Sequence, residues 1–540
     1  MIELIKTMIA DITRKIAPNF KGEILVEIPE NKEHGDYTSS VAFSLAKVFH
    51  KSSSAIADEL AKKLKSPEFS KIEAKNGFIN FFLSEECLKH QLKEILKKKN
   101  KYGFSTLQQA QGKKIQVEFI SSNPTGPPTI GNGRGGFYGD VLANILETQG
   151  HKITREFYVN DRGGQILALG RSIKLAQGKT LNLEKTELDN LYKGNYINDL
   201  AKQIDENLSV EEAGQEAVDL ILNTYIKPII KKFGINFNIW FSEKSLYKEN
   251  NYEKVMKDLM QKELIYEKDG ATWMKTLELG DTKDRVLIKS NGDETYFMSD
   301  ILYHLNKFEV RKFDKVINVW GADHHGDVSR LMGALKILGI DLERLKIVLI
   351  QFVRLVSGGK KAKVSKRAGT FITFEELVYK VGLDAARFFF LMYSNDTHMD
   401  FDMALAKERS QKNPVYYVQY AYARLCSILR KAQISKPKSQ TKSKLQITNY
   451  KLFTENDLNL IRKLIEYPEI LSDIAKTYEV HHLPRYALEL ACEFHNFYEK
   501  ERVITEDKNL TSARLALVMA TKIVLANTLN LMGIKAPDKM

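Results

Sequence analysis

The spacing of hydrophobic residues changes twice along this chain, and each change predicts a different kind of structure. Up to about residue 105, some stretches follow a helical period and others a period of two. From 112 to 410, short apolar β-favouring runs alternate with helical patterns, and from 411 to 540 the pattern is almost purely helical. We therefore expect an N-terminal α+β domain (1–105), a large α/β domain (112–410) and a C-terminal all-α domain (411–540).

The first domain is predicted to mix helices and strands. The expected helices are 2–16, 35–49 and 54–64, and the expected strands are 23–28 and 75–82. Phe78 and Asn80 fall on the second strand, where exposed side chains would stack on and hydrogen-bond an unpaired base. The same alternation is also typical of core and surface residues in a small sheet.

The large domain opens with a strand, a loop and a helix. Residues 117–120 are an apolar β-favouring run, 121–131 are rich in Pro, Gly and Asn, and 137–146 are apolar at helical spacing. A second strand at 151–159 and a helix at 160–175 follow. Strand, helix, strand, helix in this order predicts a parallel sheet that binds ligands at the carboxyl ends of its strands.

Charged helices interrupt this alternation over about 177–280, which predicts an inserted subdomain. Further strands of the alternation are expected at 285–289, 315–320 and 346–352. Five cations then lie in the Gly-flanked turn 358–370, an arrangement that is unfavourable unless something negative binds there. A solvated surface loop is the alternative interpretation.

Five helices are predicted in the last domain, at 415–432, 455–466, 468–478, 483–500 and 511–532. Tyr417, Tyr420, Arg424 and Tyr498 lie on these helices, and their side chains could stack the bases of an RNA loop. Aromatic residues three positions apart are also typical of helix cores. Residues 435–444 are a polar, basic, low-complexity segment, which is expected to be a mobile loop.

Composition and charge narrow the class of protein. A net charge of +13 over 540 residues favours a polyanionic partner such as a nucleic acid. Cys87, Cys426 and Cys492 lie far apart and no C-x-x-C is present, which argues against disulfides and structural zinc. No uninterrupted apolar run approaches the roughly 18 residues of a membrane span, so a cytoplasmic protein without a membrane partner is expected.

Two motifs are candidate ligand-binding sites. Glycines between Gly126 and Gly136 surround a helix start, where backbone N–H groups and the helix dipole favour a nucleotide phosphate. Their spacing fits neither G-x-G-x-x-G nor a P-loop. Asp323, His324, His325 and Asp327 suggest a metal, but adjacent loop residues cannot all face one ion, so substrate contact or structural hydrogen bonding is favoured and no metal site is expected.

The T-I-G-N turn at 129–132 resembles the HIGH tetrapeptide of class I aminoacyl-tRNA synthetases, and K-V-S-K at 363–366 resembles their KMSKS signature in the same order. Four stretches resemble arginyl-tRNA synthetases along essentially the whole length: VEFISSNPTGPPTIGNGRGG, YVNDRGGQI, VWGADHHGDVSRL with KVSKRAGTF, and NPVYYVQYAYARLCSIL with the terminal LMGIKAPDKM. The resemblance implies a Rossmann-like parallel-sheet catalytic domain with the KVSKR loop at 363–367, an additional tRNA-contacting N-terminal domain and a helical anticodon-binding domain.

The resemblance also implies the chemistry of an arginine–tRNA ligase. The carboxylate of L-arginine would attack the α-phosphorus of ATP, pyrophosphate would leave with Mg²⁺, and the arginyl group would pass to the 2′-hydroxyl of the terminal adenosine of tRNA(Arg). Positioning and charge stabilisation supply most of such catalysis. The family further suggests a monomer in which tRNA is required for activation.

Site residues follow from the same resemblance. The implied ATP contacts are Thr129, Gly131, Asn132, Gly133, Lys363, Ser365 and Lys366, of which Thr129, Asn132, Lys363 and Lys366 would be catalytic. The implied arginine contacts are Glu118, Asn123, Tyr296, Asp300 and His324, with Glu118 and Asp300 as acidic acceptors for the guanidinium. The implied tRNA contacts are Phe78, Asn80, Tyr417, Tyr420, Tyr498 and Met540.

Four positions depart from the family pattern. Thr129 and Asn132 replace both histidines of the tetrapeptide, so hydroxyl and amide donors must serve the phosphates. Val364 replaces the methionine of the second signature, and His324 lies where other members carry glutamine.

Two other functions remain open on the sequence. A catalytically silent paralogue that binds tRNA as a regulator would not need Lys363, Lys366, Glu118, Tyr296 and Asp300. A nucleotidyltransferase of related fold that acts on a small molecule would leave the helical C-terminal domain unexplained.

Overall fold

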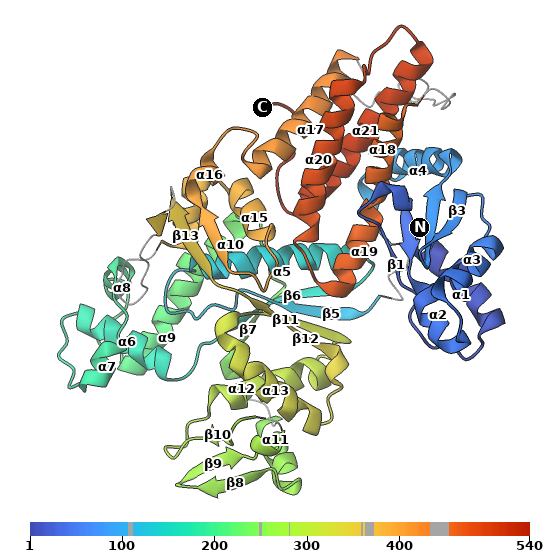
Figure 1. The fold of residues 1–540 in the computed structure, drawn as a ribbon. Helices are drawn as coiled ribbons and strands as arrows, with labels where there is room; N and C mark the ends of the chain where they lie inside the picture. The colour runs from blue at the N-terminus through green and yellow to red at the C-terminus, as the bar shows by residue number, and fades with distance from the viewer. Residues whose placement is uncertain (106–111, 248–250, 280, 358–359, 362–371, 433–452) are drawn as a thin grey trace.

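The computed structural model describes the chain except for residues 106–111, 248–250, 280, 358–359, 362–371 and 433–452. Figure 1 shows a central sheet with helices on both faces, an N-terminal α/β unit on one side and a tall bundle of C-terminal helices above the sheet. The predicted mixture of α/β and all-α regions is confirmed.

Five parallel strands form the central sheet, in the order β12-β11-β5-β6-β7. Their bounds are β5 Lys114–Glu118, β6 Lys152–Val159, β7 Ile239–Ser242, β11 Lys315–Gly321 and β12 Leu345–Ile350. Helix α5 (Ile130–Thr148) covers one face, while α12 (Tyr296–Leu305) and α13 (His325–Ile337) cover the other (Figure 1). The predicted parallel sheet is confirmed, with the carboxyl ends of β5, β6 and β11 at a common edge.

Two expectations about this region are wrong. The stretch 177–280, expected to stand apart as an insertion, supplies the fifth sheet strand, β7. Conversely, the strand expected to resume the alternation, β10 (Arg285–Ile288), pairs antiparallel with β9 (Ala271–Met274), which pairs with β8 (Ile265–Lys268) in a separate sheet. The sequence of a short apolar run does not show which strand it will pair with, because tertiary contacts decide the pairing.

Helix α5 begins at Ile130, seven residues before the predicted start at Phe137, so most of the Gly-rich segment is helical. Packing explains two of its glycines. A Cβ at Gly133 would lie 2.4 Å from the ring of Phe374, and one at Gly139 would lie 2.3 Å from the ring of Phe119. Propensity predicts a loop here, but close ring-to-backbone packing outweighs a helix penalty of about 1 kcal/mol per glycine.

The N-terminal unit is a four-stranded antiparallel sheet in the order β1-β2-β4-β3, packed with helices. Two strands were not predicted. β2 (Tyr37–Ser39) lies inside the expected helix 35–49, and β3 (Phe69–Lys75) precedes the Asn76-Gly77 turn, where both residues have positive φ as a tight hairpin requires. The remaining elements are β1 Val26–Glu27, β4 Phe78–Leu83, α1 Ile2–Ile16, α2 Val41–Phe49, α3 Ser53–Lys63 and α4 Glu85–Lys98.

The C-terminal helices are confirmed within three residues of their predicted ends: α17 Pro414–Lys431, α18 Glu455–Ile465, α19 Tyr467–Thr477, α20 His482–Lys500 and α21 Lys508–Leu531. Within the described chain, α21 is the one helix long and apolar enough to cross a membrane by length and composition, and 56% of its most apolar window is buried inside the protein. Its burial among the other helices accounts for its apolar character.

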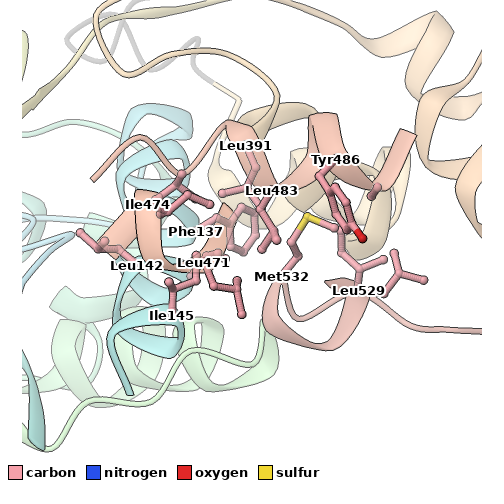
Figure 2. Close-up of a cluster of buried hydrophobic side chains, with 14 of the residues drawn as sticks. Phe137, Leu142, Ile145, Leu391, Leu471, Ile474, Leu483, Tyr486, Leu529 and Met532 are labelled. Carbon is pink, nitrogen blue, oxygen red and sulfur yellow. The ribbon is translucent and has the colours of Figure 1, made fainter. Parts of the chain in front are cut away.

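An apolar seam joins α5 to this bundle, as Figure 2 shows. It contains side chains from α5, α15 (Leu383–Leu391), α19, α20, α21 and the residue after α21, namely Phe137, Leu142, Ile145, Leu391, Leu471, Ile474, Leu483, Tyr486, Leu529 and Met532. Arg387, which is 1% exposed, crosses the seam and donates to Asp140 Oδ2 at 2.8 Å, to the carbonyl of Met532 at 3.0 Å and to that of Phe233 at 2.7 Å. Helix α5 is thus fixed to the bundle of C-terminal helices.

The remaining elements complete the large domain. Helices α6 Gly164–Ala176, α7 Lys185–Asp189, α8 Asn195–Ala201, α9 Val210–Ile221 and α10 Lys227–Lys232 precede β7, and α11 Asn251–Gln261 follows it. After β12 come β13 Val353–Ser357, β14 Lys360–Lys361, α14 Phe374–Val381, α15 Leu383–Leu391, β15 Met399–Asp402 and α16 Met403–Lys407.

Candidate active site

The T-I-G-N turn lies at the N-terminus of α5, beyond the carboxyl end of β5. The N–H and the hydroxyl of Thr129 both donate to Asn132 Oδ1 at 2.8 Å. This pairing orients the Asn132 amide, whose Nδ2 has no partner among the described residues. The first turn of α5 therefore presents an amide donor and a positive dipole end, which suit an anion such as a phosphate.

Two glycines predicted to contact ATP differ in their surroundings. Gly131 is exposed, and a Cβ there would meet only Thr129 Oγ1 at 3.8 Å. Gly133 is buried under Phe374, and its N–H donates to the carbonyl of Thr129 at 3.2 Å. Gly131 thus lies where a ligand can approach closely, whereas Gly133 is occupied by packing within the protein.

The signature lysines Lys363 and Lys366, with Ser365, lie outside the described residues. The chain that follows them is anchored beside the T-I-G-N turn: Phe374 donates its N–H to the carbonyl of Pro128 at 3.0 Å, and Thr373 forms a β-bridge with Thr129. Thr373 and Phe374, which follow the signature in the sequence, therefore lie at the start of α5.

The side chain of Asp300, on α12, makes no hydrogen bond or ion pair within the part of the chain that the structure describes. Burial, reinforced by the charges of Glu118, Asp327 and Glu243, raises the pKa of Asp300 to about 8. The charge of Lys307 opposes this shift without forming an ion pair with Asp300, so the Asp300 carboxyl group would be stabilised by a further cation.

Glu243, which the sequence analysis missed, lies beside Asp300. Its Oε1 accepts a hydrogen bond from Ser299 Oγ at 2.6 Å, while its buried Oε2 has no partner among the described residues. Burial raises the pKa of Glu243, and the charge of Asp161 adds to this. Glu243 directly follows β7, so assigning that strand to the parallel sheet would have placed it at the ligand-binding edge.

Glu118 is buried at the end of β5 and already has partners. Lys307 Nζ donates to its Oε2 at 2.6 Å, and Ser121 Oγ donates to its Oε1 at 3.1 Å. Lys307 is itself completely buried. The structure thus brings Glu118 and Asp300 together, but it gives only Asp300 a carboxylate without a partner among the described residues.

Tyr296 and Asn123 line the same region from two other elements. Tyr296 lies one helical turn before Asp300 and is 57% exposed. Burial of its hydroxyl end, together with the charge of Glu243, raises the pKa of Tyr296. Asn123 is exposed on the loop after β5, and its Oδ1 lies 3.5 Å from Asn160 Nδ2 on the loop after β6.

His324 follows the carboxyl end of β11 and is exposed. Its Nδ1 lies 3.1 Å from Asp327 Oδ2, and Asp327 in turn pairs with Arg330 at 2.9 Å. These contacts orient the imidazole at the edge where β5, β6 and β11 end. No group of three or more His, Cys, Asp or Glu side chains that could hold a metal occurs in the described ranges.

A cavity of about 540 Å³ opens next to this edge. Its wall includes Gly126, Gln165, Tyr192, Lys193 and Tyr196. Tyr196 donates to the carbonyl of Thr125 at 2.9 Å, so the cavity adjoins the loop that leads to the T-I-G-N turn.

The two N-terminal residues predicted to contact tRNA differ. Phe78 is 40% exposed and packs edge-on against Phe43, with the ring centroids 5.0 Å apart. Asn80 is 1% exposed, and its Oδ1 accepts from Thr38 Oγ1 at 2.8 Å. The expectation of an exposed Asn80 is wrong, because Asn80 faces the adjacent strand β2 rather than solvent.

The structure brings the three predicted C-terminal tyrosines together at one surface of α17 and α20. The guanidinium of Arg424 lies 4.9 Å from the ring centroids of both Tyr420 and Tyr498, and the ring of His495 lies 5.0 Å from that of Tyr417. Met540 is 53% exposed at the end of the chain. Partly exposed rings beside a cation are suited to stacking on bases.

Comparison with known proteins covers the whole chain. Residues 3–83 match "Arginyl tRNA synthetase N terminal domain", 91–402 match "tRNA synthetases class I (R), catalytic domain", and 418–540 match "DALR anticodon binding domain". The chain is 42% identical over 531 residues to the arginine–tRNA ligase of Caldanaerobacter subterraneus subsp. tengcongensis, covering 96% of this chain and 94% of that one.

A second relative and a solved structure agree. The arginine–tRNA ligase of Carboxydothermus hydrogenoformans is 43% identical over 531 residues, covering 95% of this chain and 94% of the relative. The arginyl-tRNA synthetase structure from Thermus thermophilus has the same fold, with a TM-score of 0.78 at 22% identity and full coverage of both chains. This chain therefore belongs to the class I arginyl-tRNA synthetase family, the arginine–tRNA ligases.

Proposed function

We propose that the chain joins L-arginine to tRNA(Arg), and that Asp300 and Glu243 bind the guanidinium of the amino acid. One observation carries the assignment: the half-buried Asp300 and its neighbour Glu243, whose Oε2 is buried, have carboxyl oxygens without hydrogen-bond partners among the described residues. A guanidinium supplies five N–H donors in a planar fork, which matches two carboxylates better than any other amino-acid side chain does.

The other arginine contacts are assigned from their positions around this pair. Tyr296 covers the side chain one turn before Asp300, and Glu118 borders the pocket at the end of β5. Asn123 and His324, on the loops after β5 and β11, are the partners for the α-amino and α-carboxyl ends. This arrangement directs the arginine carboxylate toward the start of α5.

ATP with its Mg²⁺ is the second substrate. Gly131 allows close approach of the nucleotide, and Asn132 Nδ2 donates to a phosphate oxygen while Thr129 holds the amide in place. Lys363, Ser365 and Lys366, which precede Thr373 in the sequence, are assigned to the triphosphate because they belong to the K-V-S-K signature. Magnesium that is bound through substrate phosphates needs few protein ligands, which is compatible with the absence of a metal cluster in the described ranges.

Two steps complete the reaction. An arginine carboxylate oxygen bonds to the α-phosphorus, and the bond from that phosphorus to pyrophosphate breaks. The 2′-hydroxyl of the terminal adenosine then attacks the arginyl carbonyl, loses its proton, and AMP leaves. The cavity lined by Tyr192 and Tyr196 is the space offered to that adenosine, because aromatic rings stack on bases.

Further tRNA contacts are assigned to Phe78 in the N-terminal unit and to Tyr417, Tyr420, Tyr498 and Met540 in the bundle. Asn80 would reach tRNA only if its strand contact with Thr38 were broken. We propose a cytoplasmic monomer.

Charging total tRNA with each of the twenty amino acids in the presence of MgATP tests the function. We expect attachment of arginine alone. Retained tRNA binding without arginine-dependent exchange of pyrophosphate into ATP would instead favour a catalytically silent paralogue.

A further inference from the structure

A completely buried lysine, Lys307, lies beneath the proposed arginine pocket. It belongs to a π turn, Asn306–Val310, that continues α12 beyond Leu305. Its ammonium donates to Glu118 Oε2 at 2.6 Å and to Asn318 Oδ1 at 2.9 Å, and it lies 3.9 Å from the ring centroid of Tyr303. Removing Lys307 or Glu118 would leave the other charge buried without its partner, which would strongly destabilise the folded protein.

Asn318, on β11, extends these contacts back to Asp300. Its Nδ2 lies 2.7 Å from His304 Nε2, and His304 Nδ1 lies 2.7 Å from the carbonyl oxygen of Asp300. Burial lowers the pKa of His304 well below its usual range, so the ring is neutral. With its proton on Nδ1, His304 donates to the Asp300 carbonyl and accepts from Asn318. Lys307, Asn318 and His304 therefore form a continuous series of hydrogen bonds.

We propose that Lys307 is a positioning residue of the arginine pocket, which neutralises Glu118 and, through Asn318 and His304, fixes the backbone that carries Asp300. The proposal rests on the function proposed above. It assigns Glu118 and Lys307 to a pair whose charges cancel before arginine arrives. The guanidinium then faces Asp300 and Glu243 as its acceptors.

Without Lys307, Glu118 would become a third desolvated carboxyl group beside Asp300. It would take up a proton or compete for the guanidinium, because like charges at this range cannot all ionise. Titratable and charged groups face the Glu118–Lys307 pair and its neighbours from every adjacent element: Asp300, Tyr303 and His304 on α12, Glu156 and Tyr158 on β6, Glu243 after β7, Arg311 after the π turn and Asp327 on α13.

The test compares wild type, Lys307→Met and the double variant Lys307→Met/Glu118→Gln. For Lys307→Met, we expect the KM for arginine in pyrophosphate exchange to rise about 10- to 100-fold with a smaller change in kcat, as when one partner of a buried charge pair is removed. Above pH 8, where the wild-type kcat/KM levels off, that of Lys307→Met should continue to rise by up to about tenfold per pH unit, because the uncompensated charge of Glu118 raises the pKa of Asp300 further.

The double variant removes both charges, so its pH dependence should return to the wild-type slope. Lys312→Met is the matched control, since Lys312 follows the same turn, is 68% exposed and pairs with Glu309 at the surface. It should change neither KM nor slope.

Unchanged KM and slope in folded Lys307→Met would overturn the proposal. If Lys307→Met does not fold, a folded double variant with the wild-type slope supports neutralisation of Glu118. Failure of both variants to fold would overturn a role in positioning, because the pair would then serve the fold. Failure of the wild type itself to use arginine would instead refute the proposed function.

Discussion

Arg387 is buried and Asp300 is half-buried, and these two charged residues of the large domain have different surroundings. Arg387 donates to the Asp140 carboxylate and to two carbonyls that end neighbouring segments, Phe233 and Met532. Asp300 has the charges of three carboxylates and of Lys307 near it, but its side chain has no hydrogen-bond or ion-pair partner within the described ranges. The first arrangement is complete without a ligand, and the second is not.

This difference separates a structural charge from a binding charge. Burying a charge is unfavourable unless a partner compensates it, so the partner must come either from the fold or from a ligand. Arg387 finds its partners across the seam between α5 and the bundle. Asp300 and Glu243 are left to a cation from outside, and the proposed substrate carries one.

The strongest test removes the charge of Asp300 while keeping its shape. Asp300→Asn should lower kcat/KM for arginine by about three orders of magnitude, because a buried charge pair loses one partner. tRNA binding should be nearly unchanged. Pyrophosphate exchange and filter binding measure the two effects. Asp293→Asn alters an exposed carboxylate shortly before α12 and should behave as wild type. Unimpaired arginylation in Asp300→Asn would refute the pocket.

The complementary test removes the charge of Arg387. Arg387→Met should lower the free energy of unfolding by about 3 kcal/mol, because Asp140 is left buried without its partner. The KM for arginine should be little changed at temperatures where the variant is folded. Arg354→Met breaks an exposed pair with Asp400 and should cost less than about 1 kcal/mol. Equal losses in the two variants, measured by urea unfolding, would contradict the comparison.

Protonation offers a third distinction. The pKa of Asp300 is raised to about 8 in the free protein, and the guanidinium binds the ionised form. Below that pH a proton must leave on binding, so arginine affinity should rise about tenfold per pH unit up to pH 8 and then level off.

The stability of the unliganded protein should follow the opposite course. A carboxyl group with a raised folded-state pKa holds its proton more tightly than it does in the unfolded chain. Its contribution to stability is present at low pH and is lost as pH rises toward 8. Calorimetric titration with arginine at several pH values measures the affinity. The dependence of that affinity on pH should vanish in Asp300→Asn.

The smallest effect concerns the two glycines of the T-I-G-N helix start. Gly133→Ala should cost about 1–3 kcal/mol of stability, because its Cβ would overlap Phe374. Gly131→Ala should leave stability nearly unchanged and raise the KM for ATP instead. Thermal unfolding and exchange kinetics separate these outcomes, and a stability loss in Gly131→Ala larger than that in Gly133→Ala would reverse the assignments.

Local patterns were sufficient for much of the architecture. The helical period at the C-terminus predicted α17 to α21, and the strand and helix succession around β5, α5 and β6 predicted a parallel sheet. These signals are strong because amphipathic helices and buried strands repeat their spacing over many residues. The motifs at 129–132 and 363–366 pointed to the family before any geometry was known.

Partners distant in sequence were not predictable in this way. Glu243 entered the pocket only because β7 joins the central sheet, and Glu118 proved to be paired with Lys307, 189 residues away. Asn80 appeared exposed on an alternating strand, yet β2 covers it. The sequence by itself determined the kinds of element and the residue types that the chemistry needs. Only the tertiary structure decided which carboxylates are already neutralised, because desolvation and pairing depend on neighbours that the chain brings together from distant positions.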